Sequence, residues 1–106
     1  MPTYVVLSDH PPSNCPSSNK AAREFAMKTM GGMDKVMEKY KIKQNVALHL
    51  DPGHKVLLVL EAPSVEAVRD MIYELGYSEW NDTVVYPTTP VAELLGKVSQ
   101  FTPIDW

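Results

Sequence analysis

The sequence predicts an α+β domain in which one four-stranded antiparallel sheet carries two helices on one face. Four short runs are rich in β-branched and aliphatic residues, and two longer segments have apolar residues every three or four positions. These runs follow the order strand, helix, strand, strand, helix, strand. This order is the ferredoxin-like plan. We expect one domain over residues 1–106, with a C-terminal extension from about residue 90.

The first half of the chain predicts one strand and one long helix. The strand covers 3–8 (TYVVLS), and a proline-rich loop separates it from a helix over 20–41 that Ser18 or Asn19 can cap. Gly31 and Gly32 interrupt the helix, where each glycine costs up to about 1 kcal/mol relative to alanine. The pair therefore indicates a bend, a break into two helices, or the close approach of another backbone.

The middle of the chain predicts a hairpin. Strands are expected over 43–50 and 55–62, and the sequence Asp51-Pro52-Gly53-His54 connects them. Proline followed by glycine is typical of a type II turn, which needs a positive φ at its second central residue. We therefore expect Pro52 and Gly53 to be the two central residues of the turn.

The last third of the chain completes the order of elements. Ser64 caps a helix that Gly76 closes, and a strand follows over 83–86. Prolines end that strand, and a short helix is expected over 91–98 (VAELLGKV) before a tail that ends in Trp106.

Composition excludes several classes of protein. With 44% hydrophobic and 22% charged residues the chain is typical of a soluble domain, and a net charge of −3 without a basic stripe argues against nucleic acid as a partner. No run approaches the ~18 apolar residues that cross a membrane, and the N-terminus has no secretory signal pattern. The single cysteine rules out an internal disulfide. We expect a cytoplasmic protein.

Two of the predicted strands are apolar on both sides. Val5 to Leu7 and Val56 to Leu60 are continuous apolar runs, whereas two helices cover one face of a sheet only. The simplest cover for the second face is the sheet of another copy, which predicts a homodimer or a higher homo-oligomer. We expect aromatic residues at this contact, namely Tyr4, Tyr86, Phe101 and Trp106.

The element order, the length, the two-sided strands and the C-terminal extension resemble the dimeric α/β barrel superfamily. The resemblance is to its small uncharacterised members, in which a strand ending in histidine runs into a loop with proline and cysteine, as in His10-Pro11-Pro12-Ser13-Asn14-Cys15-Pro16. His54 and Trp80-Asn81 also resemble that group. The superfamily includes monooxygenases, isomerases, haem-degrading enzymes and ligand binders, so the resemblance implies the fold and leaves the function open.

Chain topology predicts where the histidines lie. In this fold the end of the first strand, with His10, shares an edge of the sheet with the turn between strands two and three. A two-residue turn pairs Asp51 with His54 and His49 with Val56, which points His49, Asp51 and His54 to one face. The Cys15 loop and residues 77–82 reach the same edge.

A transition-metal site is the first interpretation of this cluster. Imidazole and thiolate are good ligands for zinc, copper, nickel and iron, and the candidate ligands are His10, Cys15, His49 and His54. The alternative is that His49 and His54 are solvated hairpin residues and His10 donates to a carbonyl.

The second interpretation is an enzyme without a cofactor, of the isomerase or monooxygenase type. His10, with Asp9 or Asp51, would act as a general base, or Cys15 would act as a nucleophile. A small molecule would lie in a cleft between sheet and helices that includes Met30, Tyr73, Trp80 and Asn81, although methionines at helical spacing also suit an ordinary core. No glycine-rich phosphate loop indicates a nucleotide cofactor. A structural or assembly module is the third interpretation.

Overall fold

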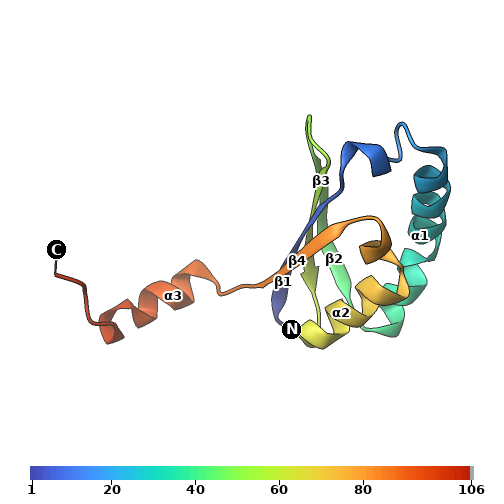
Figure 1. Cartoon of the computed structure of the whole chain (residues 1–106). Coiled ribbons are helices and arrows are strands. Elements are labelled where there is room, and N and C mark those ends of the chain that lie inside the picture. Colours follow the sequence, from blue (N-terminus) through green and yellow to red (C-terminus); the bar gives the residue numbers. More distant parts are fainter. Residues whose placement is uncertain (106) are drawn as a thin grey trace.

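The computed structural model describes residues 1–105, and Trp106 with its predicted contact lies outside the described residues. The main elements are β1 (Thr3–Asp9), α1 (Lys20–Lys39), β2 (Lys43–Leu50), β3 (Lys55–Glu61), α2 (Val65–Glu74), β4 (Asp82–Pro87) and α3 (Val91–Lys97). Short 3-10 turns cover Pro12–Asn14, Tyr77–Glu79 and Val98–Gln100. The sheet has the order β2-β3-β1-β4, and α1 and α2 lie on one of its faces (Figure 1). The predicted ferredoxin-like α+β fold is confirmed.

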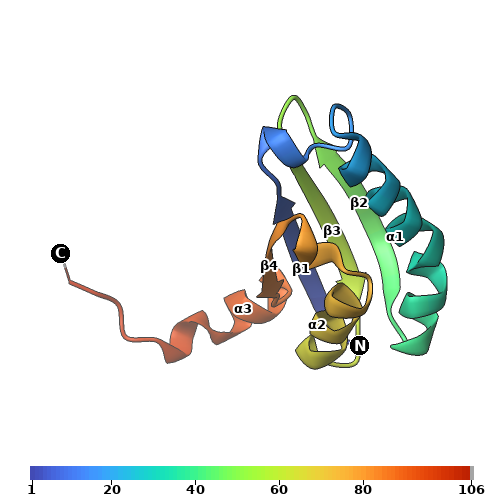
Figure 2. The ribbon, with the colours of Figure 1, turned by 45° about the vertical axis from the view of Figure 1, so that its right-hand side comes forward.

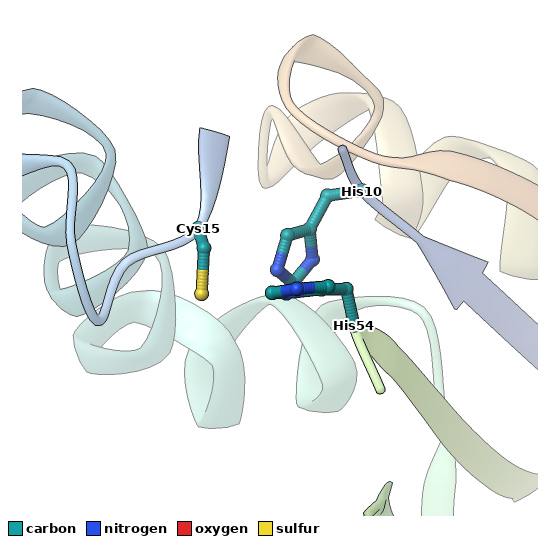
Figure 3. A group of neighbouring side chains, drawn as sticks. All are labelled: His10, Cys15 and His54. Carbon is teal, nitrogen blue, oxygen red and sulfur yellow. The ribbon is translucent and has the colours of Figure 1, made fainter. Parts of the chain in front are cut away.

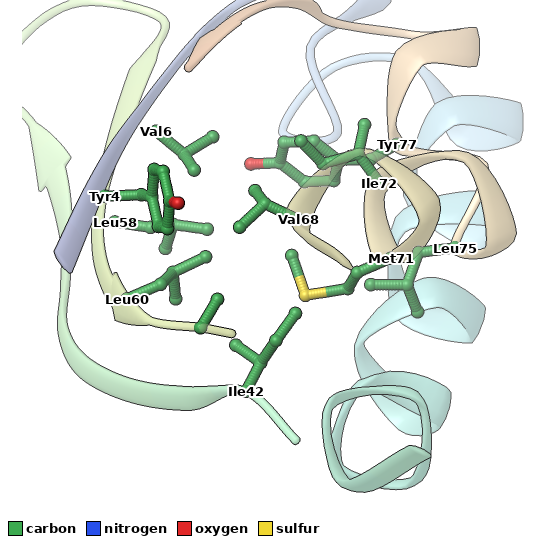
Figure 4. Close-up of a cluster of buried hydrophobic side chains, with 11 residues drawn as sticks. Tyr4, Val6, Ile42, Leu58, Leu60, Val68, Met71, Ile72, Leu75 and Tyr77 are labelled. Carbon is green, nitrogen blue, oxygen red and sulfur yellow. The ribbon is translucent and has the colours of Figure 1, made fainter. Parts of the chain in front are cut away.

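Alternation along the strands places the core between the sheet and the helices. All neighbouring strands are antiparallel, and Val6 of β1 lies between Leu58 of β3 and Val85 of β4. Val6 and Leu60 are fully buried and pack with Val68 of α2, as Figure 4 shows. Because side chains alternate between the two faces of a strand, the neighbours of Val6 in sequence point to the opposite face.

Both long helices have the side-chain caps that the sequence predicts. The Asn19 Oδ1 accepts a hydrogen bond from the backbone N–H of Ala22 at 3.0 Å, and the Ser64 Oγ accepts one from Ala67 at 3.2 Å. Helix α1 runs without a break through Gly31 and Gly32, and no neighbouring atom lies within 4 Å of a Cβ built at either position. The expectations of a break and of a close backbone approach are therefore wrong.

The hairpin has the predicted register but a different turn. His49 pairs with Val56, as expected. The Gly53 N–H donates to the carbonyl of Leu50 at 3.0 Å, so Pro52 is the third residue of the turn and not the second. The Asp51–Pro52 peptide bond is cis and the φ of Gly53 is not positive. The type II turn was therefore a wrong prediction, because Asp51 and Pro52 are its central pair.

The second face of the sheet and the C-terminal segment are both exposed. Leu48, Val84 and Tyr86 are about half-exposed on the sheet, and α3 extends away from the domain (Figure 2). None of the helices within residues 1–105 has the length and apolar character needed to cross a membrane.

Candidate metal centre

The end of β1 and the start of β3 are joined beside the hairpin turn. Their ladder ends at the pair Asp9 and Lys55, and the next backbone N–H, that of His10, donates to the carbonyl of His54 at 3.2 Å. This bond extends the ladder by one residue and places the two imidazoles side by side, with ring centroids 5.2 Å apart. Antiparallel pairing of β1 with β3 therefore brings together two histidines that are 44 positions apart in the sequence.

Cys15 completes a cluster of three potential metal ligands. One ring nitrogen of His10, one of His54 and the Cys15 Sγ all lie within 4.8 Å of one another (Figure 3). Cys15 and His54 are half-buried, and His10 is buried with 6% of its surface exposed. As the topology predicts, the three side chains share one end of the sheet.

Asn81 fixes the orientation of the His10 ring. Its Nδ2 donates to the carbonyl of Tyr77 at 3.2 Å, so its Oδ1 faces the His10 Nδ1, which is also at 3.2 Å. An amide oxygen only accepts, and therefore the hydrogen of the imidazole lies on Nδ1. In the neutral ring the His10 Nε2 then carries a free lone pair, and this atom is buried without a hydrogen-bond partner among residues 1–105.

The loop that carries Cys15 is held by the first turn of α1. The Arg23 side chain donates from Nε to the carbonyl of Pro16 and from Nη2 to that of Ser17, both at 2.8 Å. The Asn19 Nδ2 donates to the carbonyl of Ser13 at 2.9 Å. Because both helix residues bind loop carbonyls, the position of the thiol is set by α1.

The surroundings of Cys15 favour its thiolate. The Ser17 Oγ lies 2.8 Å from the Sγ, and the hydroxyl and backbone N–H of Ser17 lower the pKa of the thiol, with a smaller contribution from His54. A lowered pKa makes the thiolate, which is the form that binds metals and reacts with electrophiles, more abundant at neutral pH.

We expect Ser17→Ala to shift the reactivity of Cys15 to higher pH. The substitution removes the hydroxyl, which is the main cause of the lowered pKa, so the midpoint of iodoacetamide alkylation against pH moves upward. Mass spectrometry of alkylated protein in metal-free buffer measures the midpoint. His49→Ala is the control and leaves it unchanged, whereas an unchanged midpoint in Ser17→Ala contradicts this account of the thiol.

A surface depression leads to the histidines. It has a volume of about 380 Å³, and its lining includes His10, His54, Asp9 and Asp82. Asp9 and Asp82 are paired directly opposite each other across β1 and β4. Two like charges at a cross-strand pair repel each other, and their joint field attracts cations.

Other predicted site residues lie apart from the cluster. The Nδ1 of His49 is 2.7 Å from the Oδ1 of Asp51, and both side chains are exposed. Neither residue belongs to the group of His10, Cys15 and His54. His49 belongs to β2, which lies on the other side of β3 from β1 and His10.

The predicted ligand-binding residues divide between the cluster and two hollows. Met30 and Trp80 line an apolar cleft of about 310 Å³ between α1 and the sheet, and the Trp80 ring also lies 5.5 Å from that of His10. Tyr73 instead lines an open groove beside α2. Asn81 contacts His10, as described above.

Sequence reasoning missed Ser17 and Arg23. Ser17 bonds to Cys15 within the loop, and Arg23 bonds to loop carbonyls. The spacing of apolar residues predicts helices and strands and gives no information about contacts in a loop. The available signal was an arginine in the first turn of a helix that directly follows a proline-rich loop, since its side chain is close to several loop carbonyls.

The comparisons with known proteins identify neither a family nor a function. No protein-family model and no curated protein matches this chain. One similar solved structure is a de novo designed protein with a ferredoxin fold, determined by solution NMR, with 14% sequence identity and a TM-score of 0.49. The match covers 86% of this chain and 88% of that chain. The function is therefore inferred from the site itself.

Proposed function

We propose that the chain binds one transition-metal ion through His10, Cys15 and His54. The observation that carries the proposal is the buried Nε2 of His10, which has no partner and lies in a group with a second imidazole and a thiol. A buried polar atom without a partner costs free energy, about 1–3 kcal/mol for an ordinary group. A bound cation would remove that cost.

The spacing of the three atoms suits an ion after a small adjustment. Bonds of about 2.0 Å to nitrogen and 2.3 Å to sulfur place tetrahedral ligands roughly 3.5 Å from one another. The three ligand atoms lie within 4.8 Å of one another, and small rotations of the half-buried Cys15 and His54 side chains would shorten these distances. A histidine that binds a metal through one ring nitrogen usually donates a hydrogen bond from the other nitrogen. In His10 the Nδ1 makes this bond to the Oδ1 of Asn81.

The donor set favours zinc or a similar borderline metal. Two imidazoles and one thiolate are the ligand types that bind Zn²⁺, Cu, Ni²⁺ and Fe²⁺, while Mg²⁺ and Ca²⁺ prefer oxygen. Three protein ligands leave a fourth position for water or a substrate. That position would face the depression beside Asp9 and Asp82.

Equilibrium dialysis of tag-free protein against Zn²⁺ tests the proposal. The wild-type chain is expected to retain about one equivalent, and His54→Ala to lose at least tenfold in affinity because it removes one of three ligands. His49→Ala is the matched control, since it removes an exposed imidazole near the same turn and leaves the cluster complete. Equal losses in the two variants, or no retained zinc in the wild type, contradict the proposal.

The proposal includes a homodimer that buries the open face of the sheet. The exposed apolar residues of that face support it, because a large exposed apolar patch is typical of an interaction surface. Leu48→Glu places a charge on the exposed apolar side of the edge strand β2 and is expected to weaken the dimer, which sedimentation equilibrium measures.

A second candidate function is the binding of a small apolar molecule in the cleft between α1 and the sheet. Its favouring observation is the lining, which is largely apolar and includes Met33, Leu58 and the buried, unpartnered Nε1 of Trp80. We expect the fluorescent probe 1-anilinonaphthalene-8-sulfonate to bind there, and Ala47→Trp, which fills the cleft, to weaken that binding at least tenfold. Met27→Trp on the exposed side of α1 is the control. Equal binding in both variants contradicts this second function.

A further inference from the structure

The segment after β4 is exposed along its whole described length. Every described residue from Tyr86 to Asp105 is exposed. The segment contains α3 and the 3-10 turn that follows it, and we refer to residues 88–105 as the arm. Figures 1 and 2 both show the arm extending away from the sheet and the other helices.

The arm has an apolar stripe. Its large apolar residues recur at intervals of three and four, which places those within α3 and the 3-10 turn on one side of the helical segment, and Phe101 and Ile104 follow that segment. They are between 47% and 71% exposed, and they are Val91, Leu94, Leu95, Val98, Phe101 and Ile104. Glu93 and Lys97 form an ion pair at 3.5 Å on another side. Such a pattern is typical of a helix that packs against a surface.

The arm is too short to be stable as an isolated helix. Helix α3 has seven residues, while isolated helices shorter than about 12–15 residues are marginal in water. Its helical conformation and its apolar stripe therefore both require a surface on which to pack.

The base of the arm directs it away from its own sheet. The Thr88 Oγ1 donates to the carbonyl of Thr3 at 2.6 Å and fixes the chain beside the start of β1. Pro87 and Pro90 stiffen the connection, and Pro90 has an extended conformation with φ −54° and ψ 136°. A return to the open face would require a reversal within Thr88, Thr89 and Pro90.

The size of the open face bears on how much of a dimer interface the sheet alone could supply. Four strands spaced about 4.8 Å apart, each roughly 20 Å long, present a projected face of roughly 400 Å². A standard stable interface buries about 800 Å² on each partner. The accessible area of such a face exceeds its projected area but stays at or below this size, and the arm carries additional apolar surface.

We propose that the arms are exchanged in the dimer, so that the apolar stripe of each arm packs on the domain of the second copy. This inference rests on the proposed sheet-to-sheet dimer and names the segment that completes it. A second copy on the open face places a new surface beside the arm without any reversal of the linker, and the twofold relation makes both contacts identical.

Sedimentation equilibrium of full-length variants tests the exchange. Leu95→Glu puts a charge in the stripe and is expected to raise the dimer Kd about tenfold or more, because it removes a large apolar side chain from the interface. Gln100→Glu adds the same charge outside the stripe and should change the Kd less than about twofold. The circular dichroism of the folded domain should be the same in both variants, since Leu95 is 65% exposed and lies outside the core.

Each other outcome overturns a defined part of the inference. A dimeric wild type with an unchanged Kd in Leu95→Glu rejects arm exchange and leaves the sheet-to-sheet dimer standing. A lower Kd in Leu95→Glu shows that the arm covers its own sheet, because release of the arm would then expose the apolar face through which the sheets associate. A wild type that stays monomeric at millimolar concentration rejects the dimer and the exchange together.

Discussion

Asn81→Ala is expected to weaken zinc binding about 10- to 100-fold, the usual effect of losing a hydrogen bond that orients a metal-ligating histidine. Asn81 does not reach the ion in this proposal. Its Oδ1 holds the hydrogen of His10 on Nδ1, and without it the imidazole is free to rotate or to carry its hydrogen on Nε2. Competition with a fluorescent zinc chelator measures the affinity, and ¹⁵N NMR of the imidazole identifies the tautomer.

Asn81→Asp separates orientation from a general structural role. Aspartate keeps an acceptor for the His10 Nδ1–H, so zinc affinity should return to near the wild-type value. It cannot donate to the carbonyl of Tyr77, so the free energy of unfolding should fall. Wild-type zinc affinity in Asn81→Ala, or equally weak binding in both variants, contradicts the positioning role.

Leu60→Ala is expected to lower the free energy of unfolding by about 2–5 kcal/mol, the range for a leucine truncated in a closed core. Leu60 is 0% exposed in β3 and packs in the cluster with Val68 and Met71 of α2. Those residues belong to regular elements, so they cannot move to fill the space without disturbing the sheet. Urea denaturation at one fixed protein concentration measures the change.

Met27→Ala is the matched control for the core. Met27 is on α1 and is 64% exposed, so its truncation should change stability by less than about 0.5 kcal/mol. A loss in Leu60→Ala as small as that in Met27→Ala contradicts the core described here.

The fold was predictable because its signals are local and repeated. The run Thr3 to Ser8, the apolar stripe of α1 and the caps at Asn19 and Ser64 each specify one element. Their order then limits the topology, and the topology places His10 beside the hairpin turn. The continuous helix through Gly31 and Gly32 was not predictable, since the penalty of two glycines is small beside the packing of a 20-residue helix.

The candidate site was predictable in its location and in part of its membership, since three of the four expected ligands lie together. Strand pairing brings His10 and His54 to one edge, which follows from the order of elements alone. His49 belongs to the edge strand β2, and β3 lies between that strand and His10 on β1. The tautomer of His10 depends on Asn81 and on the carbonyl of Tyr77, and such a side-chain network arises only after the backbone has folded.

The X-ray absorption spectrum of the zinc-loaded protein tests the central claim most directly, because it identifies the ligand atoms. The account predicts one sulfur at about 2.3 Å and two imidazole nitrogens at about 2.0 Å, with a lighter atom in the open position. In Cys15→Ser the sulfur scattering should disappear. A spectrum without sulfur in the wild type, or one that is the same in Cys15→Ser, would contradict a metal centre formed by His10, Cys15 and His54.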